Sequence, residues 1–106
     1  MNTLRTYESS VLVQCPVIHG RPWLVAQRAI ETLGDGYVIH VWIGRNRATM
    51  KSIIDLMCLE ATKGKSVSYK VMAIGDGNAI DQHVRTIIDD AFHKAACGVL
   101  YEGDDG

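Results

Sequence analysis

Hydrophobic residues recur along this chain with two different periods, and the change between them separates predicted strands from predicted helices. Apolar residues at every second position over 37–43 and 67–73 predict two half-buried strands. A β-branched segment over 11–15, ended by Pro16, predicts a short first strand. The turn residues 44–46 predict a hairpin into another short strand over 47–50.

A helical period of about 3.6 residues fills the segments between these strands. One stripe of apolar residues predicts a helix that begins at about residue 19 and tolerates Pro22 in its first turn: Trp23, Ala26, Ile30 and Leu33. A brief helix is predicted over 51–58, with Ser52 placed to cap its first N–H groups. The clearest periodic run predicts a last helix that ends at Gly98; its apolar positions are Ile80, Val84, Ile87, Ile88, Ala91, Phe92 and Ala95.

The predicted order of elements is therefore β-α-β-β-α-β-α. Half-buried strands, with helices available to cover one face, indicate an α+β two-layer sandwich whose antiparallel sheet is open to water on its other face. The 106 residues include two prolines and no repeat, so we expect one domain, with its core at about 10–97 and a short acidic tail over 98–106.

Composition and charge restrict the classes of function. Hydrophobic residues make up 47% of the chain and charged residues 22%, which is typical of a folded domain. A net charge of −1 gives no general attraction for nucleic acid or an anionic membrane. Residues 1–10 are polar and include Glu8, and no apolar run is long enough to cross a bilayer. We therefore expect a cytoplasmic protein without a targeting peptide or membrane insertion.

Cysteine and histidine spacing gives little support for a metal or disulfide site. Cys15, Cys58 and Cys97 are an odd number at irregular spacing, so we expect small buried apolar residues in a reducing compartment. Cys15 lies one helical turn from His19, and His93 lies one turn from Cys97, but neither pair has a second pair beside it. No metal or other cofactor is expected.

One histidine stands out by its position. His40, His83 and His93 are expected to be ordinary surface residues, whereas His19 lies at a helix start and is followed by Gly20, Arg21 and Pro22. A helix N-terminus offers unpaired N–H groups and a positive dipole end, and an arginine adds a guanidinium suited to phosphate. Gly20 is expected to leave the backbone sterically open. A neutral imidazole nitrogen is a nucleophile, so His19 is a candidate phosphoryl acceptor; the alternative is that it only caps the helix.

Three segments resemble one known family. His19-Gly20-Arg21-Pro22 after a first strand resembles the active-site motif of HPr, the histidine-containing phosphocarrier of the phosphoenolpyruvate-dependent sugar phosphotransferase system. Residues 51–59 are similar to the regulatory-serine segment of that family, and residues 62–67 are similar to its next turn and strand. The resemblance extends over roughly residues 11–92 and implies the HPr fold, with three helices on one face of a four-stranded sheet.

The resemblance also implies roles for individual residues. His19 matches the histidine that is phosphorylated on Nδ1, Arg21 matches the arginine that contacts the phosphoryl group, and Ser52 matches the serine modified by an HPr kinase/phosphorylase. Such a carrier takes phosphate from enzyme I and passes it to the A domains of sugar-specific enzymes II. It is a substrate of other enzymes rather than an independent catalyst. Some relatives serve nitrogen-related or regulatory relays instead.

Three residues depart from the pattern of the family. Val17 and Glu60 stand where a glycine is usual, and Trp23 stands where a small residue is preferred. Because of these differences, the alternative that the protein is a divergent paralogue in an altered phosphorelay stays open.

A partner surface is also predicted from helical spacing. Four residues share a helix face opposite the Trp23 stripe: Arg21, Leu24, Val25 and Arg28. An exposed apolar patch rimmed by arginine is typical of a surface that docks an acidic partner. The resemblance implies that Ile53, Ile54 and Met57 join this face, where enzyme I and the enzyme II domains bind. The alternative is that Leu24 and Val25 pack under the short helix.

We therefore predict a monomeric phosphocarrier in which the backbone N–H groups of Gly20 and Arg21 cradle the phosphate. Two other classes of function stay open. One is a regulatory module that uses the same docking face, signals through docking or Ser52 phosphorylation, and transmits no phosphate. The other is an unrelated open-faced sandwich that binds a metabolite, which the absence of a second polar constellation in the sequence disfavours.

Overall fold

The computed structural model describes residues 4–75 and 77–98, and its elements follow the predicted order. The strands and helices are β1 (Thr6–Leu12), α1 (Gly20–Glu31), β2 (Tyr37–Ile43), β3 (Asn46–Thr49), α2 (Ile53–Met57), β4 (Ser66–Ala73) and α3 (Gln82–Ala96). The α+β class is confirmed. The predicted tail lies almost wholly outside the described residues.

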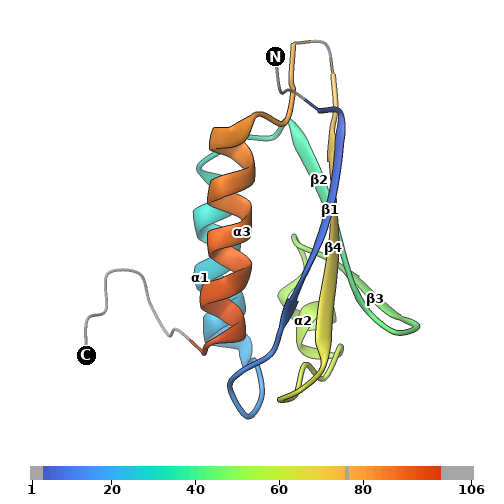
Figure 1. Cartoon of the computed structure of the whole chain (residues 1–106), viewed down its shortest axis with the longest axis vertical. Coiled ribbons are helices and arrows are strands. Elements are labelled where there is room, and N and C mark those ends of the chain that lie inside the picture. The colour runs from blue at the N-terminus through green and yellow to red at the C-terminus, as the bar shows by residue number, and fades with distance from the viewer. Residues whose placement is uncertain (1–3, 76, 99–106) are drawn as a thin grey trace.

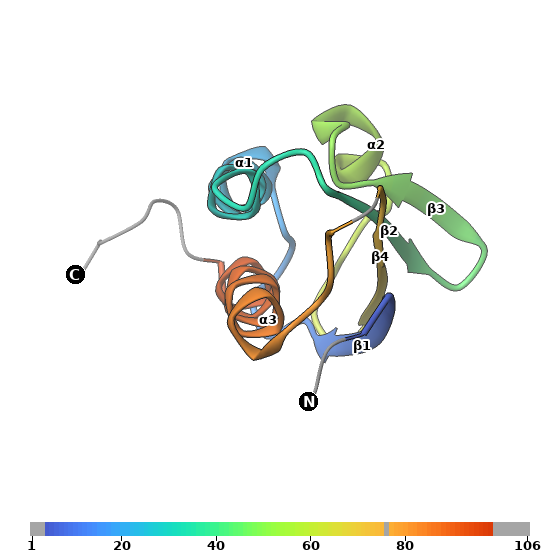
Figure 2. The ribbon, with the colours of Figure 1, turned by 90° about the horizontal axis from the view of Figure 1, so that it is seen from above.

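The four strands form one antiparallel sheet in the order β1-β4-β2-β3. The helices lie on one side of this sheet, with α1 and α3 side by side and α2 next to β3 (Figures 1 and 2). Within the described part of the chain, no helix covers the other side. The same residues contain no helix that is long and apolar enough to span a bilayer.

The first strand differs from its prediction. It occupies Thr6–Leu12 rather than 11–15. β1 is an edge strand whose residues alternate between exposed and more buried positions, and its inward side carries only Tyr7, Ser9 and Val11. A half-polar edge strand lacks the apolar alternation that reveals a strand in the sequence.

The core lies between the sheet and the helices. Trp23 of α1 and Phe92 of α3 are fully buried, as their spacing predicted, and they make an edge contact at 6.2 Å between ring centroids. Phe92 also stacks on Tyr69 of β4 at 3.8 Å. Leu33 is half-buried, and Ile80 is buried although it precedes α3. The Asp81 carboxylate caps α3 by accepting the N–H of Val84 at 2.9 Å.

The expectation of three buried cysteines is wrong. Cys58 and Cys97 are exposed, and Cys15 is half-buried, with its thiol donating to the carbonyl of Val17. Cys58 and Cys97 are the residues that end α2 and α3. The chain turns towards solvent at these ends, so their side chains leave the core.

A polar cluster joins the two layers of the sandwich. The Asp89 carboxylate of α3 accepts hydrogen bonds from the hydroxyls of Tyr7 at 2.6 Å and Tyr69 at 2.5 Å. Burial raises the pKa of Tyr69, and the hydrogen bond to Asp89 raises it further. The pKa of Tyr7 is raised by the same two causes. Both tyrosines are therefore held as neutral donors to one acceptor.

Replacing Asp89 by alanine leaves these two hydroxyls without their acceptor. We expect Asp89→Ala to lower the free energy of unfolding by about 2 to 3 kcal/mol, because a buried donor without a partner retains its desolvation penalty. The matched control is Asp90→Ala, which removes an exposed carboxylate paired with Lys94 at 3.1 Å on the same helix. That pair contributes about 0.5 kcal/mol or less. Urea denaturation compares the two variants, and equal losses would contradict the assigned role of Asp89.

Candidate active site

His19 is the residue directly before α1. Its backbone is extended, its side chain is exposed, and the imidazole makes no capping hydrogen bond. The His19 carbonyl accepts the N–H of Trp23 at 3.4 Å, which starts the helical hydrogen bonding. The structure therefore places His19 at the cap position but does not use its ring as the cap. The ring nitrogens remain available for chemistry.

The loop before His19 is anchored at both of its ends. The N–H groups of Gln14 and Cys15 both donate to the carbonyl of Ala96, at 2.8 and 3.1 Å. The N–H of Ile18 donates to the carbonyl of Ala61 at 2.9 Å, and the Ile18 side chain is buried. The end of α3 and the segment after α2 thus fix the position of the residue next to His19.

The two positions where the HPr resemblance leads us to expect glycine behave differently. Val17 forms a bridge with Thr62, and its backbone lies outside the left-handed region, so a valine fits there without strain. Glu60 has φ of 53° and is the only non-glycine residue with positive φ within residues 4–75 and 77–98. An L-residue in this conformation costs about 1 kcal/mol or more relative to glycine.

The first turn of α1 provides the donors of an anion site. The N–H groups of Gly20 and Arg21 lie before the first helical hydrogen bond, Pro22 has no N–H, and the first turn carries no acidic side chain. Arg21 is exposed, whereas Trp23 is buried in the core and fixes the turn to the rest of the protein. The arrangement combines a fixed helix end with an exposed guanidinium.

Gly20 is not sterically open as the sequence suggested. A Cβ at Gly20 would lie 3.1 Å from the Sδ of Met57, which is tighter than an ordinary contact. The glycine therefore allows α2 to approach the start of α1, and it places Met57 close to His19. This contact between helices was not visible in the sequence.

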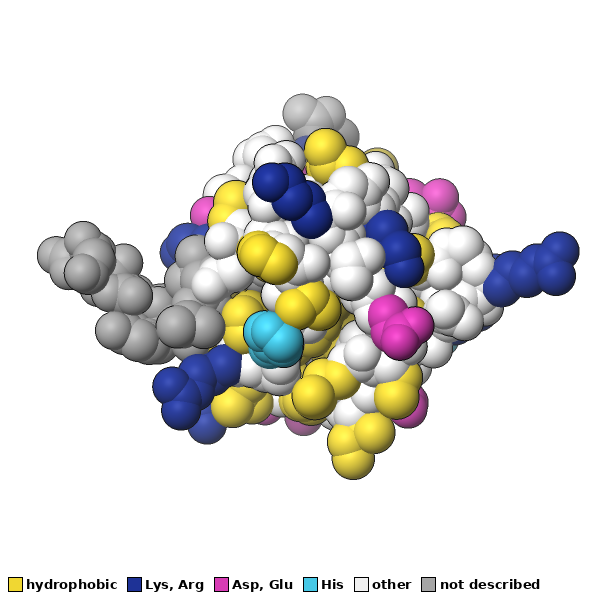
Figure 3. All heavy atoms as spheres, turned by 90° about the horizontal axis from the view of Figure 1, so that it is seen from below, with side chains coloured by type: hydrophobic (Ala, Val, Ile, Leu, Met, Phe, Trp, Pro, Cys, Tyr) yellow, Lys and Arg dark blue, Asp and Glu magenta, His cyan; other side chains and the backbone are white. Residues whose placement is uncertain are grey.

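Only some of the residues predicted for the partner surface are exposed and lie together. Ile54 is 74% exposed and Met57 49% exposed, whereas Ile53 and Leu24 are half-buried. Figure 3 shows the end of the molecule at which α1 begins, where hydrophobic side chains gather around a histidine and basic side chains lie both on this face and at its edges. Arg21 and Arg28 are both exposed.

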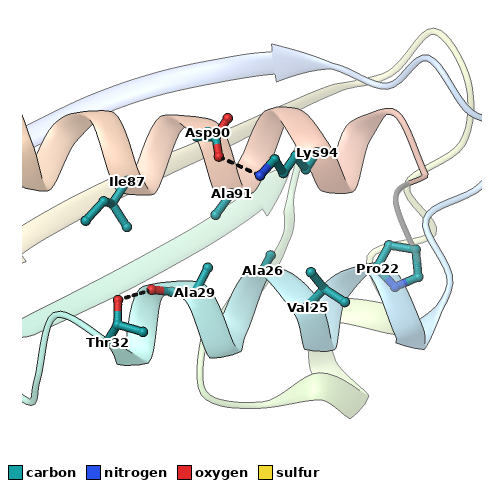
Figure 4. Close-up of a pocket in the computed structure, with 9 residues that line it drawn as sticks. All are labelled: Pro22, Val25, Ala26, Ala29, Thr32, Ile87, Asp90, Ala91 and Lys94. Atoms are coloured by element: carbon teal, nitrogen blue, oxygen red, sulfur yellow. Dashed lines mark hydrogen bonds and ion pairs between the residues drawn. The ribbon is translucent and has the colours of Figure 1, made fainter. Parts of the chain in front are cut away.

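Val25 lies away from this patch. It lines a groove of about 210 Å³ between α1 and α3, together with Pro22 and Ala26 of α1 and Ile87 and Ala91 of α3 (Figure 4). Val25 therefore neither packs under α2 nor shares the surface of Ile54 and Met57.

The remaining candidates lie where the sequence suggested. Ser52 is half-buried and caps α2, its hydroxyl accepting the N–H of Asp55 at 3.3 Å. His40, His83 and His93 are exposed. Among the described residues, no group of three or more His, Cys, Asp or Glu side chains is placed to hold a metal ion.

The fold is identified by comparison with solved structures and not by comparison of sequences. No protein-family model matches the sequence, and no curated protein is similar to it. The histidine-containing phosphocarrier protein of Mycoplasma superposes with a TM-score of 0.63 at 17% identity, over 92% of this chain and 100% of that chain. This chain has the HPr fold. HPr-C-His from Thermoanaerobacter tengcongensis superposes with a TM-score of 0.59 at 21% identity, over 81% and 94% of the two chains.

The HPr fold prediction is thus confirmed, and the strained backbone of Glu60 in this fold gives a testable consequence. We expect Glu60→Gly to raise the free energy of unfolding by about 0.5 to 1 kcal/mol, because glycine adopts positive φ without a Cβ clash. Glu60→Ala is the control, since it removes the carboxylate but keeps the strain, and it should give no such gain. Urea denaturation measures both, and equal effects would show that the side chain rather than the backbone is responsible.

Proposed function

We propose that this protein is a phosphocarrier that accepts a phosphoryl group on His19 and passes it to a second protein. The observation that carries the proposal is the exposed His19 imidazole, which makes no capping bond and lies directly before the N–H donors of α1 in an HPr fold. A protein that only carries a phosphoryl group needs a nucleophile and a site for the transferred charge. The exposed imidazole of His19 and the N–H groups that precede the first helical hydrogen bond of α1 support these two roles.

In the proposed transfer, one P–N bond forms at His19 and one bond between phosphorus and the donor breaks. A ring nitrogen of His19, Nδ1 by the HPr resemblance, attacks the phosphorus of a phosphorylated donor, and the bond from phosphorus to the donor atom breaks. The N–H groups of Gly20 and Arg21 and the guanidinium of Arg21 hold the charge of the transferred group. The P–N bond has a high transfer potential. A nucleophile of the acceptor protein therefore attacks the phosphorus, the P–N bond breaks, and the His19 imidazole is regenerated.

The proposed partners follow from the surface around the site. The apolar side chains of Ile54 and Met57 and the guanidinium of Arg21 lie towards the His19 end of α1, and Arg28 adds an exposed guanidinium in the last turn of the same helix. Such a surface suits an acidic partner with an apolar centre. By the HPr resemblance the donor is enzyme I and the acceptor is the A domain of a sugar-specific enzyme II. A nitrogen-related relay would use the same site with other partners.

The direct test of this function is phosphorylation of the whole chain by enzyme I and phosphoenolpyruvate. Wild type should gain one phosphoryl group that is labile in acid and stable in base, whereas His19→Ala should gain none. His19→Ala should change the free energy of unfolding by less than about 1 kcal/mol, because the ring makes no capping bond. His93→Ala, an exposed histidine on α3, is the control and should be phosphorylated like wild type. Incorporation that survives in His19→Ala would remove His19 as the acceptor.

Arg21 should act mainly on the rate of transfer. We expect Arg21→Ala to slow phosphoryl transfer by more than about tenfold, since a lost charge-assisted contact in the transition state costs about 2 kcal/mol. Arg21→Lys should recover only part of the rate, because an ammonium cannot form the two-pronged contact. Arg45→Ala in the β2–β3 turn is the charge-matched control. Rapid-quench kinetics that show equal rates for Arg21→Ala and wild type would exclude Arg21 from the transfer step.

A regulatory role is the second candidate, and the position of Ser52 favours it. Ser52 caps the short helix that presents Ile54 and Met57, so a charge on its hydroxyl lies next to the docking surface. The HPr resemblance implies an HPr kinase/phosphorylase as the modifying enzyme. In this candidate, docking itself carries the signal.

Ser52→Asp distinguishes the effect of a negative charge on the stability of α2 from its effect on docking to enzyme I. It should fold normally, because aspartate also caps a helix, whereas Ser52→Ala should lose about 1 kcal/mol of stability. We expect Ser52→Asp to raise the KM for enzyme I and leave the maximal rate of transfer nearly unchanged, through weaker docking to an acidic partner. Transfer assays over a range of enzyme I concentrations measure this, with thermal melts alongside. Unchanged transfer in Ser52→Asp would mean that Ser52 is only a helix cap.

A further inference from the structure

One face of the sheet is turned away from the helices (Figure 2). Side chains on that face line a polar hollow of about 420 Å³. Strand pairing builds it from residues that are far apart in the sequence. Glu8 of β1 pairs with Lys70 of β4, Lys70 pairs with His40 of β2, and the next position of the same face pairs Trp42 with Arg47 of β3. These five residues and Met72 line the hollow.

Trp42 provides a flat aromatic surface within this hollow. Its side chain is only half-buried, and the guanidinium of Arg47 lies 5.7 Å from the centroid of its ring. This guanidinium lies over the ring, and Arg47 is an exposed side chain, so a base that stacks on Trp42 takes the place of the arginine there. By contrast, Trp23 is fully buried in the core.

The polar groups around Trp42 favour an anion. Lys70, Arg47 and His40 supply donors, and Glu8 is the one carboxylate that lines the hollow. The Lys70 Nζ and the Glu8 Oε1 are 3.8 Å apart with both side chains well exposed, so this pair is weak and easily rearranged. The carboxylate of Glu8 remains available to accept an N–H or O–H of a ligand.

We propose that this hollow binds a nucleoside phosphate, with the base stacked on Trp42 and the phosphate held by Lys70 and Arg47. The volume falls in the usual range for small-ligand sites. Trp42 is the only Trp, Tyr or Phe on this face of the four strands, and the whole chain has a net charge of −1. A nucleic-acid surface would present several stacking rings and a positive field, so a single nucleotide fits better.

This inference goes beyond the phosphocarrier function, because the hollow lies on the opposite face of the sheet from His19 and α1. No second polar constellation is visible in the sequence. Trp42 and the polar residues that line the hollow lie at positions 8, 40, 42, 47 and 70, and only the register of the strands brings them together. A metabolite-binding activity on this face would accompany phosphate transfer rather than replace it.

The test is titration of the ¹⁵N-labelled full chain with adenosine 5′-monophosphate. We expect the indole N–H of Trp42 and the amides of β2 and β4 to shift, while the indole N–H of the buried Trp23 stays in place. Adenosine alone and inorganic phosphate alone should bind at least about tenfold more weakly, because each supplies half of the contacts. Lys70→Ala and Arg47→Ala should weaken binding at least about fivefold, whereas Lys63→Ala, an exposed lysine in the turn before β4, should not.

Each of the following results would overturn the proposal. The first is a Trp42 indole signal that does not move at millimolar nucleotide. The second is equal binding of phosphate and nucleotide, which would show that the ring contributes nothing. The third is binding of a single-stranded oligodeoxyadenylate without binding of the mononucleotide, which would make this face a nucleic-acid surface. Trp42→Val must also lose the response of β2 and β4, and its circular dichroism checks that the sheet is intact.

Discussion

The whole arrangement depends on backbone hydrogen bonds that fix the loop between β1 and α1. The carbonyl of Ala96 at the end of α3 accepts two N–H groups from this loop, and the carbonyl of Ala61 accepts the N–H of Ile18. These bonds bring the end of α3, the segment after α2 and the start of α1 to one end of the molecule. His19 therefore starts a helix whose position is set by elements on both sides of it.

The same constraint explains why docking and chemistry are neighbours. Because Gly20 lacks a Cβ, Met57 approaches the first turn of α1, and α2 presents exposed apolar side chains next to this turn. Trp23 anchors this turn from the inside through Phe92, which stacks on the sheet. The helix layer thus frames the proposed site at His19, and the sheet leaves its other face uncovered for the hollow around Trp42.

Periodicity predicted the order of elements, the fold class and the cap at Ser52, because each depends on local spacing and turn chemistry. Features that depend on tertiary contacts were missed. β1 is a half-polar edge strand without a clear apolar pattern, and Cys58 and Cys97 are carried outward by helix ends. The Met57–Gly20 contact and the turn of Val25 towards α3 come from helix packing, which no single segment reveals.

In the proposed carrier, the start of α1 receives the phosphoryl group on a backbone that is already in place before phosphorylation. Amide chemical shifts of the phosphorylated and unphosphorylated protein test this most directly. We predict large shifts at Gly20 and Arg21, with little change at Gln14, Cys15 and Ile18, whose hydrogen bonds hold the loop. Unmoved amides at Gly20 and Arg21, or shifts spread through the loop over 13–18, would contradict a preformed site at this helix end.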